Sequence, residues 1–220
     1  MRSEAICLAI HPWSRTSHVV TWLTPTGIVS SVVKGAVRPK SFFLGQYDLN
    51  YTCDVVYYER SRGDLHALRE CSPLRRRDGL RDDFRALALA GYCRRLVRDY
   101  APEGPDCSEW FDLLERLLDD LAAPRDDAPS LVAQLVGFEL EVLHLMGLAP
   151  ELEAQEGAFR LRGERTIPVS AEVAAYLKAP LGKVENSKIP LDAARVIGVF
   201  YHFHLDCAVD TRRSVLAMIS

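Results

Sequence analysis

The part of the sequence best suited to chemistry is a short basic stretch, VVKGAVRPKS, at residues 32–41. Lys34, Arg38 and Lys40 follow directly on a β-branched run, and the same stretch holds a glycine and a proline, which favour a loop. A nucleoside-triphosphate loop would need another glycine spacing and a helix opening at its end, and this stretch has neither. Cations gathered on one loop are suited instead to contacting the phosphates of a nucleic acid.

Other cations extend this basic set. Arg62 lies in a predicted turn, and the run Arg75–Arg77 falls where the strand-rich part of the chain ends. The candidate DNA-contacting residues are Lys34, Arg38, Lys40, Arg15, Arg62, Arg75, Arg76 and Arg77. The run Arg75–Arg77 has a second interpretation, as a solvated connector between two domains.

Aromatic side chains in the same part of the chain are candidates for stacking under bases. A small barrel also fills its core with aromatic side chains, so the same residues are equally candidates for the core. They are Trp13, Trp22, Phe42, Phe43, Tyr47, Tyr51, Tyr57 and Tyr58.

Motifs typical of enzymes are missing from the sequence. It has no G-x-S-x-G, no H-E-x-x-H and no G-x-G-x-x-G after a strand. His202 and His204 are two residues apart, as are Glu139 and Glu141, so on a helix the members of each pair point to different faces. We therefore interpret the two glutamates as a solvated or capping feature, and we expect no catalytic residue, no metal and no cofactor.

The six cysteines are spread along the chain without a C-x-x-C pair, which argues against a structural zinc site and a disulfide framework. We expect most of them to be small buried hydrophobic side chains. No apolar run reaches the roughly 18 residues that a bilayer requires. The N-terminus also lacks the features of a secretory signal, so the sequence predicts a cytosolic protein.

The net charge of −3 argues by itself against a general polyanion binder. The charge is unevenly distributed, because residues 1–80 hold 11 Lys and Arg against 7 Asp and Glu, whereas residues 81–220 hold 16 against 23. Such an asymmetry can mark a nucleic-acid-binding face on the basic half, although a difference of this size also arises by chance.

The elements that position these cations are predicted from hydrophobic patterning. Short apolar or β-branched runs separated by turn residues predict five strands and a small closed barrel that ends at Pro73. These strands are expected at residues 5–10, 18–23, 28–33, 48–59 and 65–71.

From about Gly79 the apolar spacing becomes helical. Ser108 marks a second helix, Ser130 is a fair N-cap for a third that Gly147 closes, and Ser170 starts another. The last predicted helix covers about residues 191–206, and residues 150–168 are the least regular part, with a hairpin as one interpretation.

Several motifs then follow one another in a characteristic order and spacing. They are WSRTS at Trp13–Ser17, a turn at Thr24–Gly27, KGA at Lys34–Ala36, Lys40-Ser41, Leu44-Gly45, GFELEVLHLMGLAPEL at Gly137–Leu152, and Arg213-Ser214 near the end. In this order the chain resembles the RecO family of bacterial recombination mediators.

The resemblance implies an α+β fold, with an N-terminal OB-fold β-barrel at residues 1–78 followed by an all-α C-terminal domain at residues 79–220. It implies binding of single- and double-stranded DNA and annealing of complementary strands. Within the RecF pathway, it implies loading of RecA together with RecR onto DNA coated by single-strand-binding protein. Lys34, Arg38 and Lys40 would contact phosphates, in a cytoplasmic, nucleoid-associated protein that is not an enzyme.

The sequence departs from the family pattern in two places, and each departure changes what the resemblance implies. Residues 150–169 hold no cysteine where many members carry a four-cysteine zinc module, so we expect no zinc. Arginines that precede "F-E-L" in relatives, where the tail of single-strand-binding protein docks, correspond here to Val136 and Gly137, which leaves that contact open. The acidic balance of residues 81–220 suggests a weaker DNA affinity than a more basic member of the family would show. An alternative is a protein-interaction adapter whose OB-fold has little DNA affinity of its own.

Overall fold

The computed structural model describes residues 1–58, 65–102, 104, 106–124, 129–155, 158–162, 167–180, 188–205 and 209–220. The chain forms two compact units, residues 1–79 with 94–122 and residues 80–93 with 123–220. An N-terminal closed barrel is followed by helices, so the predicted α+β class with an OB-type barrel is confirmed. The domain limits at residues 78 and 79 stay a prediction.

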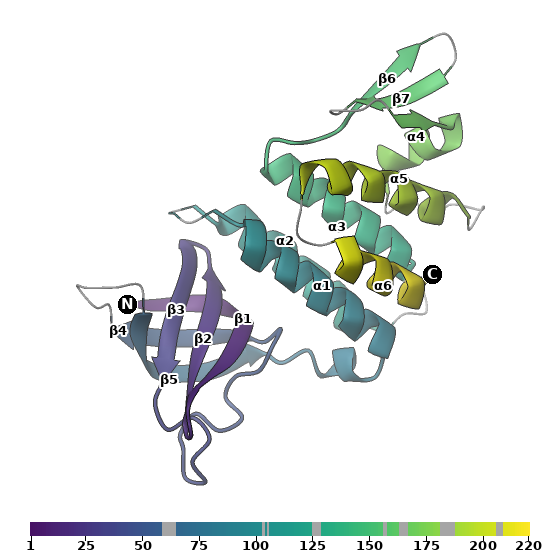
Figure 1. The fold of residues 1–220 in the computed structure, drawn as a ribbon. Helices are drawn as coiled ribbons and strands as arrows, with labels where there is room; N and C mark the ends of the chain where they lie inside the picture. Colours follow the sequence, from purple (N-terminus) through teal and green to yellow (C-terminus); the bar gives the residue numbers. More distant parts are fainter. Residues whose placement is uncertain are drawn as a thin grey trace. The chain divides into compact units, whose positions relative to one another are not determined.

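The barrel consists of five strands in the order β1-β2-β3-β5-β4 (Figure 1). Neighbouring strands are antiparallel except β3 and β5, which run parallel over Ser30–Val32 and Leu65–Ala67 and thereby close the barrel. The strands are β1 Arg2–Ser14, β2 Ser17–Thr24, β3 Gly27–Val33, β4 Thr52–Tyr58 and β5 Leu65–Arg75.

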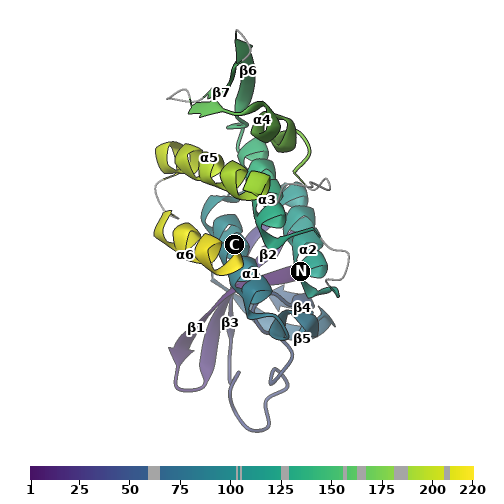
Figure 2. The same ribbon diagram turned by 90° about the vertical axis from the view of Figure 1, so that its right-hand side faces the viewer.

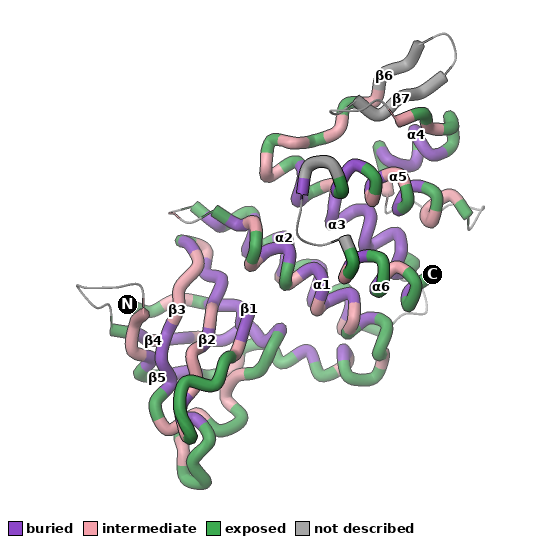
Figure 3. The backbone as a smooth tube through the Cα atoms, viewed as in Figure 1, coloured by how far each residue is buried: buried purple, intermediate pink, exposed green. Residues whose placement is uncertain are grey.

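The inner face of the barrel is packed with alternate residues of each strand, which Figure 3 shows as buried positions along the strands. Trp22 is the largest of these side chains, and its indole Nε1 donates a hydrogen bond to the Ser31 hydroxyl at 2.9 Å. A buried indole N–H with a partner avoids the cost of an unmet donor. The cluster comprises Ala5, Cys7, Val20, Trp22, Val33, Ala36, Tyr51, Cys53, Val55, Tyr57, Leu68 and Cys71.

The predicted end of the barrel at Pro73 is wrong. Strand β5 continues to Arg75, with Pro73 opposite Cys53 of β4. In the described part of the chain β5 pairs with β3 only over Leu65–Ala67. Beyond Ala67, the edge of β5 that faces β3 therefore has no backbone hydrogen bonds to a neighbouring strand. Proline is tolerated on such an edge because no backbone N–H is required there.

Two helices follow, α1 Phe84–Tyr100 and α2 Ser108–Ala122, preceded by a short 3-10 helix, Asp78–Arg81. The boundary between the compact units falls inside α1, between Cys93 and Arg94. Helix α2 is attached to the barrel at its start, where the Cys107 N–H donates a hydrogen bond to the Pro25 carbonyl at 3.0 Å.

The second unit contains the helices α3 Leu131–Leu145, α4 Ala171–Leu177, α5 Lys188–His204 and α6 Val209–Ile219. It also holds a three-stranded sheet in the order β6-β7-β8, with β6 Glu151–Gln155, β7 Ala158–Arg162 and β8 Ile167–Val169. The sheet occupies the segment where the sequence suggested a hairpin, and α6 is an element that patterning did not indicate. No helix in the described ranges is long and apolar enough to cross a membrane.

The helix ends use the predicted caps. The hydroxyls of Ser130 and Ser170 accept hydrogen bonds from Ala133 and Val173 N–H at 3.2 Å each. Gly147 has φ of 70° directly after α3 and donates a hydrogen bond to a carbonyl of the last turn at 2.9 Å. A left-handed residue is the usual end of a helix, and glycine adopts it without strain.

A buried ion pair joins the helices of the second unit. Glu139 on α3 is 0% exposed and accepts hydrogen bonds from the Arg212 guanidinium at 2.7 and 2.8 Å and from the Tyr92 hydroxyl at 2.7 Å. Burial, and then the Glu139 charge, raise the pKa of Tyr92 well above its usual value, so its hydroxyl stays a donor. The interpretation of Glu139 as solvated or capping is therefore wrong, whereas Glu141 is exposed.

The cysteines behave as the sequence predicts. Five of them are buried free thiols: Cys7, Cys53, Cys71, Cys93 and Cys107. Burial raises the pKa of the Cys93 and Cys7 thiols, which keeps them neutral and unreactive. Cys207 lies outside the described residues.

Candidate nucleic-acid interface

One end of the barrel is formed by the turn between β1 and β2 and by the long loop after β3. Figures 1 and 2 show both segments at this end. Two hydrogen bonds join them, because the Val37 N–H donates to the Thr16 carbonyl at 3.3 Å and the Gly35 N–H donates to the Ser17 hydroxyl at 3.2 Å. The fold thus brings Arg15, in the turn, to the basic stretch that begins at residue 34.

The loop after β3 is held by successive turns. Arg38 N–H donates to the Gly35 carbonyl at 3.1 Å, and Ser41 N–H donates to the Arg38 carbonyl at 2.9 Å. Gly35 has φ of 69°, which favours glycine, and a Cβ at this position would lie 3.3 Å from the Arg38 Cδ. The path of the loop around Arg38 therefore depends on Gly35.

The far part of the loop is anchored to the barrel. The Tyr47 hydroxyl lies 2.8 Å from the His18 Nδ1, and the Tyr47 ring packs edge-on against Trp22. The thiols of Cys53 and Cys71 lie 3.5 and 3.7 Å from the Gln46 carbonyl, as weak donors. Between these anchors and the turn at β1–β2, the loop exposes Lys34, residues 37–40, Phe42 and Leu44, while Ala36 is buried in the core.

Four of the predicted cations lie at this end of the barrel, and we call them the loop-end cations: Arg15, Lys34, Arg38 and Lys40. All four are exposed, and none has an acidic partner within 4.0 Å among the described residues. Their charges are therefore available to a polyanion rather than neutralised by the fold. The electrostatic attraction that such a cluster exerts on phosphates is the sequence-independent part of DNA binding.

The run Arg75–Arg77 belongs to a different part of the barrel. Arg75 is opposite Thr52 on β4, which is in turn opposite Ile6, near the start of β1. Arg15 directly follows Ser14, where β1 finishes. The other loop-end cations lie on the loop after β3, which is hydrogen-bonded to the same turn. The structure thus separates two groups of cations that the sequence combined.

Arg77 is a structural side chain, only 8% exposed. Its guanidinium donates to the Asp119 carboxylate at 2.7 Å, to the Thr52 hydroxyl at 2.9 Å and to the Asn50 carbonyl at 2.9 Å. Its backbone has φ of 53°, which is uncommon for a residue with a side chain and persists only where the surroundings enforce it. Arg77 holds α2 against the barrel and is unavailable to DNA.

The other two arginines of the run are more exposed. Arg75 forms an ion pair with Glu115 and lies 3.9 Å from Asp119, and the Glu115 hydrogen bond raises its pKa. Arg76 is exposed. The run is therefore partly a buried attachment point for α2, which neither of its two sequence interpretations anticipated. Arg62 lies outside the described residues, so its role stays a prediction.

The structure sorts the eight aromatic candidates into two groups. Five belong to the barrel interior or its edge: Trp22, Tyr51 and Tyr57 are buried, and Phe43 and Tyr47 pack against the core. Three are exposed, namely Trp13, Phe42 and Tyr58. The Arg69 guanidinium covers the Tyr58 ring at 5.4 Å from its centroid, so only Trp13 and Phe42 are open and close in sequence to the loop-end cations.

The arginines of α1 are explained by the fold. Arg94 donates to the Leu8 carbonyl of β1, and burial lowers its pKa. Arg95 and Arg98 pair with Asp99. Arg94 is therefore a structural side chain, and Arg95 and Arg98, unlike the loop-end cations, have a carboxylate partner.

Ser17 is the residue of this site that the candidate set omitted. Its hydroxyl accepts the Gly35 N–H and so fixes the start of the basic loop. The signal was present in the sequence, because the WSRTS and KGA motifs that carry the family resemblance are the two segments in contact. In the described part of the chain, no three His, Cys, Asp or Glu side chains gather closely enough to hold a metal ion.

Comparison with known proteins agrees with this picture. A family model described as "Recombination protein O N terminal" matches residues 1–77, and one described as "Recombination protein O C terminal" matches residues 81–158. DNA repair protein RecO of Anaeromyxobacter dehalogenans is 37% identical over 159 residues, covering 70% of this chain and 59% of the relative. The same-named protein of Geobacter metallireducens is 31% identical over 153 residues, covering 69% of this chain and 60% of the relative.

The chain spans about three fifths of the length of the curated relatives it matches. A more distant relative, DNA repair protein RecO of Roseiflexus, is 26% identical over 193 residues and extends the match to 88% of this chain. The two family models follow one another in the order of the barrel and the helices, and the motifs at the candidate interface lie within the first. The chain belongs to the RecO family.

Proposed function

We propose that this chain is a DNA-binding recombination mediator that acts in DNA repair and recombination through the RecF pathway. It binds single- and double-stranded DNA, anneals complementary strands and helps RecR to load RecA. The observation that carries the proposal is the set of loop-end cations, Arg15, Lys34, Arg38 and Lys40, exposed together at one end of an OB-type barrel. Barrels of this kind bind oligonucleotides through their loops and the adjoining strand face.

The proposed activity requires no chemical step. Two complementary strands repel each other through their phosphates, and cations that neutralise part of that charge release condensed counterions and lower the repulsion. The strands then pair through their own bases. Annealing in this form needs no catalytic group, cofactor or metal, and we propose that the protein is not an enzyme.

We assign DNA binding to residues 1–78. A contact with single-strand-binding protein at the positions of Val136 and Gly137 is disfavoured, because both are buried inside α3. We place the protein in the cytoplasm, associated with the nucleoid, where its proposed DNA substrate lies.

The test is fluorescence anisotropy with a labelled single strand of about 30 nucleotides, titrated at about 50 and about 200 mM salt. Four phosphate contacts on a single strand predict that affinity falls about 50-fold between the two salt concentrations. The variant K34E/R38E/K40E should lose most of the affinity and most of the salt dependence while remaining folded.

A matched control carries the same change of charge in the second unit. Lys178, Arg195 and Arg213 are exposed, and K178E/R195E/R213E should bind within about threefold of the wild-type protein, because the loop-end cations that are proposed to contact phosphates are unchanged. Equal losses in the two triple variants would mean that net charge rather than the loop-end site governs binding. An absence of binding by the wild-type protein at low salt would favour the protein-interaction adapter.

A further inference from the structure

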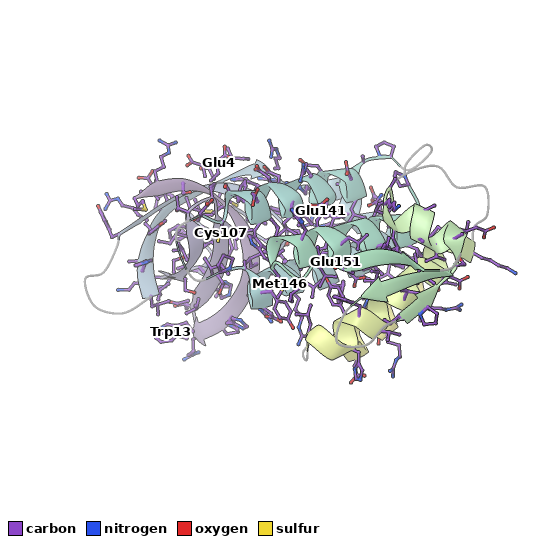
Figure 4. The ribbon with its side chains drawn as sticks, turned by 90° about the horizontal axis from the view of Figure 1, so that it is seen from above. Glu4, Trp13, Cys107, Glu141, Met146 and Glu151 are labelled. Carbon is purple, nitrogen blue, oxygen red and sulfur yellow. The ribbon has the colours of Figure 1, made fainter. Side chains whose placement is uncertain are left out.

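Phe42 is the most exposed of the large apolar side chains in the described residues, at 94%. It stands in the loop after β3, next in sequence to Lys40 and Ser41. Trp13 is 61% exposed and lies at the end of β1, and Figure 4 labels it at the outer edge of the barrel. Aromatic rings are enriched at binding surfaces, and these two rings, left in water, contribute little to the packing of the barrel.

Trp13 occupies a β-bulge. Pro12 pairs with His18 and Ser14 pairs with Ser17, so Trp13 is the extra residue on β1 at the point where the register shifts. A bulge bends its strand and turns a side chain away from the regular alternation, and bulges occur frequently beside functional sites. The bulge lies directly before Arg15, so the same turn presents both a ring and a cation.

The loop-end cations restrict what can cover these rings. An apolar protein surface placed on Phe42 and Trp13 would remove water from neighbouring cations without offering them partners, which costs free energy. A nucleic acid strand with unpaired bases offers both kinds of contact, because phosphates meet the cations and base faces meet the rings. A duplex offers phosphates alone, since its base faces are stacked inside.

We propose that Phe42 and Trp13 stack with unpaired bases and give this site its preference for single-stranded over duplex DNA. The inference rests on the proposed function, because it assumes that the loop-end cations bind DNA. In this arrangement the cations set the affinity for either form, and the two rings discriminate between the forms.

The experiment compares three ligands of equal length with the wild-type protein and F42A: a poly-dT strand, an abasic strand with the same phosphates, and a duplex. Phe42→Ala should weaken binding of the dT strand about tenfold and leave the abasic strand and the duplex within about twofold. L44A is the control, since Leu44 is exposed on the same loop but carries no aromatic ring, and it should bind all three ligands as the wild type does.

Trp13 provides a second readout. The other two tryptophans, Trp22 and Trp110, are buried, so quenching of emission by a bound strand reports on Trp13. The dT strand should quench the emission of the wild-type protein, the abasic strand should not, and W13F should remove the effect. Both rings are exposed, so these substitutions should leave folding intact.

The outcomes separate the two proposals. If F42A binds the dT strand as tightly as the wild type, or weakens all three ligands equally, the stacking inference is overturned while DNA binding stands. If the wild-type protein binds none of the ligands at low salt, the proposed function fails and the inference falls with it. Loss confined to the dT strand supports both.

Discussion

The barrel carries two groups of basic side chains that have opposite surroundings. Arg15, Lys34, Arg38 and Lys40 extend into solvent, whereas Arg77 is buried among carboxylate, hydroxyl and carbonyl oxygens. The two groups have the same chemistry, so the difference lies in what the fold places against them. A cation whose hydrogen bonds are already met stabilises the protein, and a cation without a partner remains available to a ligand.

The partners of Arg77 come from a distant part of the chain. Glu115 and Asp119 lie one turn apart on α2 and face the end of β5, where they meet Arg75 and Arg77. Among the described residues, no ion pair joins a carboxylate to a cation of the loop after β3. Helix α2 thus neutralises one group of cations and leaves the other unpaired.

Arg2 is an intermediate case, exposed but paired. Its guanidinium donates to the Asp54 carboxylate of the neighbouring strand at 3.0 Å. The pair lies in solvent, so its contribution to stability is small and depends on salt. The three situations form a series from a buried arginine with all its partners, through an exposed pair, to cations without a carboxylate partner.

The largest effect is expected from Arg77→Ala. Removing the guanidinium leaves the Thr52 hydroxyl and the Asn50 carbonyl without their donor and removes one of the two arginines that pair with Glu115 and Asp119, so the free energy of unfolding should fall by about 3 kcal/mol. The measurement is urea denaturation. Arg76→Ala, an exposed neighbour, should change stability by less than about 0.5 kcal/mol.

DNA binding by the same variants tests whether Arg77 is structural or contacts DNA. The folded fraction of Arg77→Ala should keep the wild-type affinity, because Arg77 is buried away from the loop-end cations. A large loss of affinity in the folded variant, with stability unchanged, would reverse the assignment of Arg77 as structural.

A smaller effect is expected from Gly35→Ala, which changes the shape of the basic loop without touching a charge. The left-handed backbone at φ of 69° costs a non-glycine residue about 1 kcal/mol, and the new methyl group would press on the Arg38 Cδ. Stability should fall by that amount and DNA affinity should fall severalfold. Anisotropy and urea denaturation measure the two effects.

Gly91→Ala is the matched control for this change. Nothing lies within 4 Å of a Cβ at Gly91, which is inside α1, so alanine there should leave DNA affinity unchanged and raise stability slightly. If both variants bind DNA equally well, the conformation of Gly35 has no bearing on the interface.

The smallest effect concerns the Arg2–Asp54 pair and its dependence on pH. The hydrogen bond from Arg2 lowers the pKa of Asp54 below its usual value of 3.8, so the folded state favours the charged carboxylate. The stabilisation is therefore present above that value and is lost as the pH falls through the lowered pKa. Asp54→Asn should be slightly less stable than the wild type near neutral pH.

The measurement is the difference in free energy of unfolding between the two proteins across a pH series. The difference should shrink steadily as the pH falls below 3.8 and through the lowered pKa of Asp54, and high salt should reduce it at neutral pH. A difference that grows on acidification would show that Asp54 is stabilised in its neutral form instead.

Much of the fold follows from local patterns. Serines at the N-caps of α3 and α4, glycine after α3 and alternating β-branched runs identified these elements, because caps and periodicity act within a few residues. The end of β5 was misplaced, since Pro73 is tolerated only because of which edge of β5 has a partner. Helix α6 was missed, and its attachment through Arg212 to the buried Glu139 depends on a residue far away in the sequence.

The sequence by itself determined the barrel followed by helices, the basic loop with its glycine, and the motifs that place the chain in the RecO family. Only the tertiary structure decided which cations remain exposed and which aromatic rings leave the core. The residue type determines whether a side chain carries a positive charge or an aromatic ring. Whether either is available to a ligand depends on partners such as Asp119 for Arg77 and on a register shift at Trp13, which arise from segments brought together by folding.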